Sequence, residues 1–258
     1  MKKLLFYILI FLPVGTFAAP AIVQTKSQNG GGYVNSFTST FTTSVTSGNT
    51  IIMYLTGGNG DIPTITDNQG NGYFEVASTT DERRTWMYTA YNVTGGTVTV
   101  TMQNTPGVFS DFSLIMREYS GLTTTNPLDR NATGNDGGAY IQTHTSNPTG
   151  TTAQASELVV GCGGSSGSTY VGWSAGSGYG NLATQDGFDL YTYGAMEDLI
   201  LSSIGTPAAS FSTIEYVRGQ VITGTYKASG ASPVSPPSNI RAFFNGIINI
   251  NGRLNLAN

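Results

Sequence analysis

Residues 67–72, with the sequence DNQGNG, are the segment whose residue types and spacing come closest to a metal site. In a calcium loop of the EF-hand type, the oxygen ligands at alternate positions would be Asp67, Gln69 and Asn71. The twelfth position of such a loop is a bidentate Glu, but here it is Ser78. We therefore expect Asp67 to hydrogen-bond the backbone of a tight connection, with Gly70 or Gly72 at positive φ. Calcium is the alternative, and no other cofactor is indicated.

Two segments match the G-x-S-x-G pattern of serine hydrolases, with Ser165 and Ser174 at their centres. The nucleophile elbow of those enzymes lies between a strand and a helix, and no helical pattern follows either match. His144 is the single histidine and precedes both serines, whereas in that fold the histidine comes last. We expect no hydrolase activity that depends on these residues, and we expect His144 to be an exposed strand residue. A single histidine also excludes the usual multi-histidine zinc sites.

Glu118 is a charge inside the apolar run Ile115 to Tyr119, next to Arg117. Neighbouring residues of a strand point to opposite faces, so Glu118 and Arg117 cannot simply pair with each other. Either Glu118 has a buried hydrogen-bonding partner or it lines a cleft, as one carboxylate of a glycosidase would. The structural role is favoured because a buried charge must be paired wherever it occurs.

Aromatic residues in the Gly-rich stretch 171–180 are candidates for binding sugar rings. Most aromatic side chains of strands belong to the core, but this stretch has the composition of an exposed loop, and loops often carry function. The candidate ligand-binding residues are Trp173, Tyr179, Asn181 and Tyr191. We expect Trp173 and Tyr179 to be exposed to solvent.

These candidates need a scaffold, and the hydrophobic pattern predicts strands throughout. Residues 97–102, TVTVTM, alternate strictly between polar and apolar, which is typical of a half-buried strand. More uniformly apolar or aromatic runs predict central strands covered on both faces. These runs are Ile51–Leu55, Trp86–Val93, Leu114–Tyr119, Leu158–Cys162, Leu190–Tyr193 and Val221–Tyr226. Gly, Asn, Asp and Pro clusters separate them, a spacing that indicates an all-β sandwich or barrel.

A weak internal repeat has a period of 107 residues. Ile51 and Leu158 begin similar apolar runs (158 − 51 = 107), and so do Leu114 and Val221 (221 − 114 = 107). The hypothesis is a pair of related half-sandwiches in one core; the alternative is that unrelated strands resemble one another.

Three motifs in this order resemble a β-sandwich module of exported bacterial and phage-related proteins. They are D-x-x-G-N-x-Y beginning at Asp67, A-x-N-V-x-G-G beginning at Ala90, and E-Y-S-G-L beginning at Glu118. The resemblance covers roughly residues 20–228 and implies a jelly-roll-like, lectin-like sandwich. It implies no particular ligand or activity.

The first eighteen residues resemble a secretory signal peptide, with Lys2 and Lys3 before a short apolar stretch and Ala18 at the expected cleavage site. That stretch is too short to span a membrane, and no later segment is apolar enough. Without the two lysines, 9 basic residues face 15 acidic ones, a net charge of −6, which argues against a nucleic-acid partner. Cys162 is the single cysteine, so the chain can form no intramolecular disulfide.

Residues 231–239 form a Pro-rich linker, and the tail 240–258 contains two Asn-Gly hairpin signals. We expect a small β meander that docks on its own sandwich or on a neighbouring chain. Its candidate assembly residues are Phe243, Phe244, Ile248 and Leu254.

Together these features predict a signal peptide (1–18), an all-β, jelly-roll-like sandwich (19–230), a linker and a β tail. The expected function is that of a secreted, non-catalytic module that recognises a glycan or another cell-surface ligand through sandwich loops. A structural subunit of an extracellular assembly, self-associating through its tail, is the second possibility, and a secreted glycoside hydrolase is the third.

Overall fold

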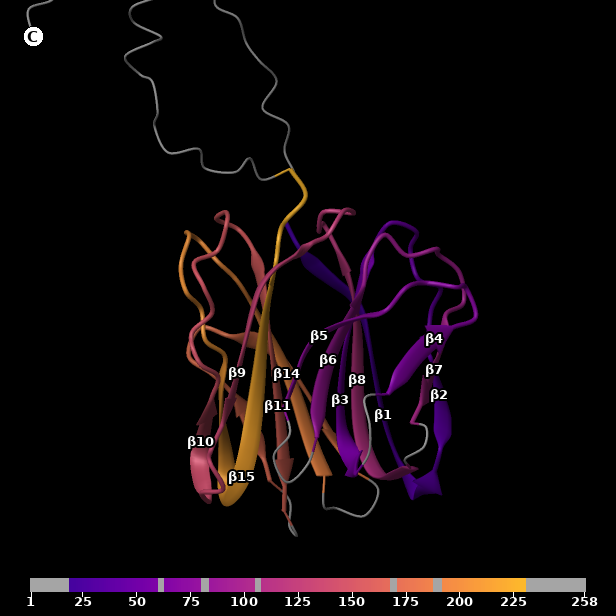
Figure 1. The fold of residues 1–258 in the computed structure, drawn as a ribbon. Helices are drawn as coiled ribbons and strands as arrows, with labels where there is room; N and C mark the ends of the chain where they lie inside the picture. Colours follow the sequence, from indigo (N-terminus) through magenta and orange to yellow (C-terminus); the bar gives the residue numbers. More distant parts are fainter. Residues whose placement is uncertain are drawn as a thin grey trace, which may run out of the picture.

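The computed structural model describes residues 19–59, 63–79, 84–104, 108–167, 171–187 and 192–230. Within these ranges the regular structure consists of antiparallel strands, without a helix (Figure 1). The predicted all-β sandwich is therefore confirmed. The expected signal peptide, the Pro-rich linker and the β tail with Phe243, Phe244, Ile248 and Leu254 lie outside the described residues.

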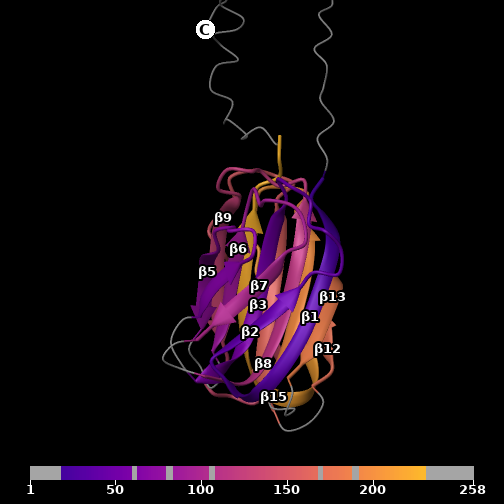
Figure 2. The ribbon, with the colours of Figure 1, turned by 90° about the vertical axis from the view of Figure 1, so that its right-hand side faces the viewer.

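The first half of the chain forms a five-stranded sheet with a three-stranded sheet outside it (Figures 1 and 2). The strand order of the larger sheet is β1 (Ala21–Val34), β8 (Val108–Ser120), β3 (Thr50–Asn59), β6 (Thr85–Ala90) and β5 (Phe74–Thr79). The order of the smaller sheet is β2 (Ser36–Thr40), β7 (Thr99–Gln103) and β4 (Thr64–Asp67).

The second half forms one larger sheet around β15 (Ser210–Tyr226). Residues 220–226 of β15 pair with β9 (Leu128–Asn135), and residues 218–226 pair with β11 (Leu158–Ser166). The sheet continues through β14 (Thr192–Ile200) to β13 (Gly180–Asp186). The first part of β15 pairs instead with β10 (Ile141–Thr145) and β12 (Trp173–Ala175).

The two halves repeat one topology. The order β9-β15-β11-β14-β13 matches β1-β8-β3-β6-β5, and the set of β10, the first part of β15 and β12 matches β2-β7-β4. The starts of β1 and β9 are 107 residues apart (128 − 21 = 107), the period found in the sequence. Across the sandwich, β1 faces β13 and β5 faces β9, which is the arrangement produced by a two-fold axis between the sheets. The hypothesis of two related half-sandwiches is therefore supported by the strand order.

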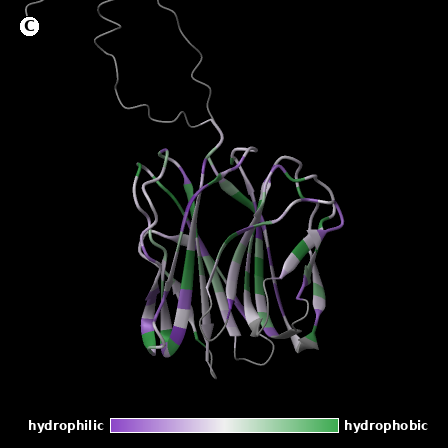
Figure 3. Ribbon diagram, in the orientation of Figure 1, coloured by the Kyte–Doolittle hydropathy of each residue, from purple (hydrophilic) through white to green (hydrophobic). Residues whose placement is uncertain are grey.

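Three apolar clusters hold these layers together, because the central strands bury both faces. One cluster lies between the five-stranded and three-stranded sheets of the first half, and another lies between the corresponding layers of the second half. The third fills the space between the two halves and includes Tyr54, Ile115, Val160, Cys162, Ile222 and Tyr226. Figure 3 shows the resulting hydrophobic bands along the strands. Cys162 is a buried free thiol, and its burial raises the pKa of that thiol.

Candidate ligand-binding site at the bend of β15

Strand β15 bends where it passes from the outer layer into the main sheet. Thr143 pairs with Ser212 and Ile141 pairs with Val217, so the four residues 213–216 lie opposite the single residue Gln142. An excess of this kind is a large β-bulge, and bulges bend a strand and redirect its side chains. The Gln142 amide holds the bulge by donating to the Ile214 carbonyl at 2.5 Å.

The bulge exposes a group of large side chains to solvent. Ile214 and Tyr216 are 65% and 67% exposed, and Tyr140, directly before β10, is 60% exposed. The Arg218 guanidinium lies over the Tyr140 ring, 4.8 Å from its centroid, which is the geometry of a cation–π contact. We call Tyr140, Ile214, Tyr216 and Arg218 the corner patch. It lies at the lower left of Figure 1, where β10 and the first part of β15 meet.

A buried histidine supports this bend from inside. His144 is fully buried, and its Nδ1 lies 2.7 Å from Asp136 Oδ2. The same carboxylate oxygen accepts the Gly219 N–H at 2.6 Å, and His144 Nε2 lies 3.3 Å from Thr213 Oγ1. Gly219 must be glycine, because a Cβ there would collide with the imidazole. The bend is thus held at Thr213, the first residue of the bulge, and at Gly219 beyond it.

The prediction that His144 is an exposed strand residue is wrong, because β10 turns its face toward Trp173 and Asp136. Thr213, His144 and Asp136 do follow the hydroxyl–imidazole–carboxylate order of a nucleophilic triad. However, Thr213 is buried and its hydroxyl donates to the Glu215 carbonyl at 2.8 Å. This arrangement braces the backbone and leaves no accessible nucleophile. The absence of a hydrolase activity dependent on Ser165 or Ser174 stays a prediction.

The prediction that Trp173 is exposed is also wrong. Trp173 is 8% exposed and packs edge-on against Phe211, with ring centroids 5.4 Å apart. The Gly-rich stretch contains strand β12, whose pairing with β15 turns this side chain inward. Gly163 leaves room for the ring, since a Cβ there would lie 3.1 Å from Trp173 Cζ3.

Of the other predicted ligand-binding residues, Tyr179 and Asn181 are described, and each makes contacts within the protein. Tyr179 is half-buried against the Trp173 cluster and lines a shallow groove of about 330 Å³ with Ser177, Leu199 and Pro207. Asn181 has φ +50 and uses its amide to bind Asp198 Oδ1 at 2.7 Å, which is a structural role. Tyr191 lies outside the described residues.

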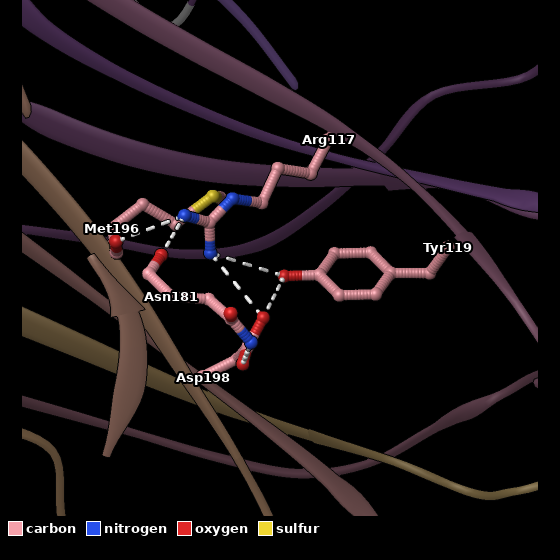
Figure 4. Close-up of polar contacts among 5 residues, drawn as sticks. All are labelled: Arg117, Tyr119, Asn181, Met196 and Asp198. Atoms are coloured by element: carbon pink, nitrogen blue, oxygen red, sulfur yellow. Dashed lines mark hydrogen bonds and ion pairs between the residues drawn. The ribbon is translucent and has the colours of Figure 1, made fainter. Parts of the chain in front are cut away.

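Asn181 belongs to a polar cluster between the sheets, shown in Figure 4. Arg117 Nη1 lies 3.4 Å from Asp198 Oδ2, and the Tyr119 hydroxyl donates to the same oxygen at 3.0 Å. Arg117 Nη2 donates to the carbonyls of Met196 and Asn181. Arg117, Tyr119, Met196 and Asp198 are buried, whereas Asn181 is exposed at the edge of the cluster. The cluster connects β8 of the first half with β13 and β14 of the second half.

Glu118 points away from Arg117, as the strand alternation predicts, and it has the favoured structural role. Its carboxylate accepts hydrogen bonds from the Gln24 amide at 2.7 Å, the Thr46 N–H at 2.8 Å and the Asn49 amide at 2.6 Å. All these partners belong to the first half, and Glu118 is fully buried. It therefore anchors a connecting segment over the outer face of the sheet and lines no cleft.

The Asp67 segment forms the tight connection expected from its sequence. Asp67 Oδ1 accepts the N–H groups of Gln69 and Asn71 at 2.9 and 3.0 Å, and Gly70 has φ +74. The side chains of Gln69 and Asn71 bind the backbone at Thr97 and Thr94 respectively. The three candidate calcium ligands are thus engaged with the protein itself. Within the described ranges, no three His, Cys, Asp or Glu side chains form a group that could hold a metal ion.

Two buried carboxyl groups of the second half have raised pKa values. Burial raises the pKa of Glu157 to about 7, and the nearby Asp129 adds to the shift. Burial also raises the pKa of Glu197 to about 7, against the opposing effect of the backbone hydrogen bonds from Gly176 and Ser210. These groups lie away from the corner patch and belong to the interior.

Sequence reasoning missed Tyr140 and Tyr216. The segment Ile214-Glu215-Tyr216-Val217-Arg218 follows Phe211 and Thr213 in a plain strand alternation, which hides the bulge. A hint was available in the sequence. Alternate residues of a strand share one face, and here Ile214, Tyr216 and Arg218 place apolar and charged side chains on the same face.

No protein-family model matches the chain, and no match was found among curated proteins or solved structures. In the part of the chain described above, no helix is long and apolar enough to cross a membrane.

Proposed function

We propose that the protein is a non-catalytic carbohydrate-binding module and that the corner patch is its ligand-contact surface. The observation that carries this proposal is a pair of tyrosine rings, each more than half exposed, at one bend of a rigid sandwich. Aromatic rings offer an apolar face on which the C–H groups of a sugar can stack, while a hydroxyl at the edge stays available for hydrogen bonds. Exposed apolar groups clustered in this way are typical of interaction sites.

The surroundings of the patch suit a polyhydroxylated ligand. Gln142 is next to Tyr140 in the sequence and lies opposite the bulge that carries Tyr216, and its side chain is partly exposed. Arg218 adds donors beside the ring of Tyr140. Because His144 and Asp136 fix the bend, the rings are presented on a preorganised backbone, which lowers the entropic cost of binding.

A glycan array with the purified protein tests the proposal. Binding to at least one class of glycan is expected, with affinity reduced at least tenfold in Tyr140→Ala and Tyr216→Ala. Phe74→Ala is the matched control, because Phe74 is 53% exposed but lies on β5 of the other half. No binding to any glycan, or equal loss in the Phe74 control, would contradict the proposal.

A structural subunit of an extracellular assembly is the second candidate. Gly230, the last described residue, follows the end of β15 that pairs with Leu158 and is remote from the bend. A neighbouring chain could therefore bind residues 240–258 without covering the corner patch. Light scattering with and without residues 238–258 tests this candidate, which requires a larger particle for the full chain.

A further inference from the structure

Thr79 and Gln220 bring a hydroxyl and a side-chain amide into contact between the two halves. Thr79 is on β5 and Gln220 on β15, and the Thr79 hydroxyl donates to Gln220 Oε1. The two residues are only 6% and 4% exposed. A hydroxyl oxygen thus lies beside an amide group at a place with little exposure to solvent.

We propose that this pair reacts to form an intramolecular ester cross-link. Thr79 Oγ1 attacks Cδ of Gln220, a C–O bond forms, and the C–N bond of the amide breaks. The hydroxyl proton is transferred to the departing nitrogen, which leaves as ammonia. The electron pair of the broken C–N bond stays on that nitrogen, so the exchange is complete without an oxidant, a reductant or a co-reactant.

The structure provides two conditions that favour this reaction. The sheets hold the reacting groups against each other, and fixed proximity of this kind can equal a very high effective concentration. The reaction occurs once per molecule, so a slow rate is sufficient. Burial then protects the ester from hydrolysis.

The neighbourhood is polar enough to accommodate the polar intermediate. Thr79 is paired with Thr85, whose hydroxyl lies 3.0 Å from that of Thr56. Gln220 is paired with Gly164, and a Cβ at Gly164 would lie 2.6 Å from both the Thr85 and Tyr54 hydroxyls. This end of the space between the sheets therefore collects hydroxyl groups around the reacting pair.

The bond would also give the fold a covalent link that it lacks otherwise. Cys162 is the single cysteine, so no intramolecular disulfide can join the halves. Thr79 and Gln220 are 141 residues apart, and a cross-link that closes a long loop reduces the entropy of the unfolded chain most.

Intact-mass measurement of the full chain tests the proposal. The wild type and Thr79→Ser are expected to weigh about 17 Da less than their own sequences, the mass of one ammonia molecule. Thr79→Val and Gln220→Ala are expected at their full sequence masses. Any processing at the N-terminus is the same in all four proteins and does not affect this comparison. Fragmentation of a protease digest should show the peptides of Thr79 and Gln220 joined.

Folded wild-type protein at its full sequence mass would overturn the proposal. So would a loss of ammonia that persists in Thr79→Val, since cyclisation at an Asn-Gly pair such as Asn71-Gly72 releases the same mass. Thr79→Val should also melt roughly 10 °C below Thr79→Ser. Equal melting temperatures, with no joined peptides in the wild type, would leave the contact as a simple hydrogen bond.

Discussion

The two halves of the sandwich place different residues at matching positions of their outer layers. Phe37 of β2 stacks on Phe112, with ring centroids 3.6 Å apart, and so completes an apolar layer. His144 of β10 stands 107 residues later (144 − 37 = 107) and binds Asp136 instead. The repeated strand order therefore does not need a histidine here, because the first half forms the same layer without one.

The second difference is how the middle strand of the outer layer connects to the main sheet. In the first half, β7 ends at Gln103 and β8 begins at Val108, whereas in the second half the single strand β15 covers both roles. Continuity forces β15 to bend, and the bend exposes Tyr216 and Ile214. The proposed binding site therefore lies where the second half departs from the shared topology.

The largest effect is expected where the two halves are joined, at Arg117 and Asp198. Arg117→Met removes the cation and leaves the Asp198 carboxylate buried, with only Tyr119 and Asn181 as donors. Loss of one partner of a buried ion pair costs about 3 kcal/mol or more in the free energy of unfolding. Urea denaturation measures this cost.

Arg130→Met is the control for Arg117→Met, since the Arg130 side chain is 47% exposed and lies 3.9 Å from Asp129. A surface pair of this kind contributes about 0–1 kcal/mol. Equal effects of the two substitutions would mean that the cluster in Figure 4 does not hold the halves together.

The next largest effect on stability is expected when His144 is replaced by phenylalanine, the residue at the matching position of the first half. His144→Phe introduces the ring that the first half uses, but it leaves Asp136 Oδ2 with only the Gly219 N–H. A destabilisation of about 2 kcal/mol is expected from the lost hydrogen bonds of a buried group. Adding Asp136→Asn to His144→Phe should recover part of this loss, because the uncompensated charge is removed. If the double variant is less stable than the single one, the imidazole–carboxylate pair is not the reason for the histidine.

The halves should also differ in their response to pH. Glu157 stands 107 residues after Thr50 (157 − 50 = 107), so a titrating group replaces a neutral one. Burial raises the pKa of folded Glu157 to about 7, above the ordinary value of 4.5. Its contribution to stability is therefore present below pH 4.5 and is lost as the pH rises through 7.

Glu157→Gln keeps the neutral form at every pH. The variant should match the wild type near pH 4.5 and have a higher free energy of unfolding than the wild type at pH 8, in urea titrations at both pH values. A variant that is less stable than the wild type at pH 8 would show that the ionised carboxylate is favourable in the folded protein.

Much of the fold was predictable because central strands carry a strong hydrophobic pattern. Ile51–Leu55 and Leu158–Cys162 bury both faces, and their spacing of 107 residues already indicated a repeat. Glu118 and Asp67 were also assigned correctly, since a buried charge and a Gly-rich turn each have few structural solutions. Local chemistry determines these features.

The candidate site was not predictable in the same way, because the exposure of a side chain depends on the register in which distant strands pair. Trp173 was assigned to a loop from its glycine neighbours, but three paired residues of β12 place it in the core. The mixture of apolar and charged residues on one face is a hint that Tyr216 is exposed, but it does not reveal the four-residue bulge opposite Gln142. Pairing between distant strands decides both outcomes.

The smallest effect on stability is expected at the corner patch itself. Tyr140→Ala and Tyr216→Ala remove rings that are more than half exposed, so each should change the free energy of unfolding by no more than about 0.5 kcal/mol. Tyr119→Ala is the matched control, because this fully buried ring belongs to the core between the halves and its removal should cost about 3–5 kcal/mol. Urea denaturation of the three variants gives the comparison directly. Removing a side chain that the fold needs lowers the free energy of unfolding, whereas removing one that only contacts a ligand leaves it nearly unchanged. A loss above 1 kcal/mol at Tyr216 would mean that the bend uses its exposed ring to fold, and the assignment of binding to the second half would then lose its basis.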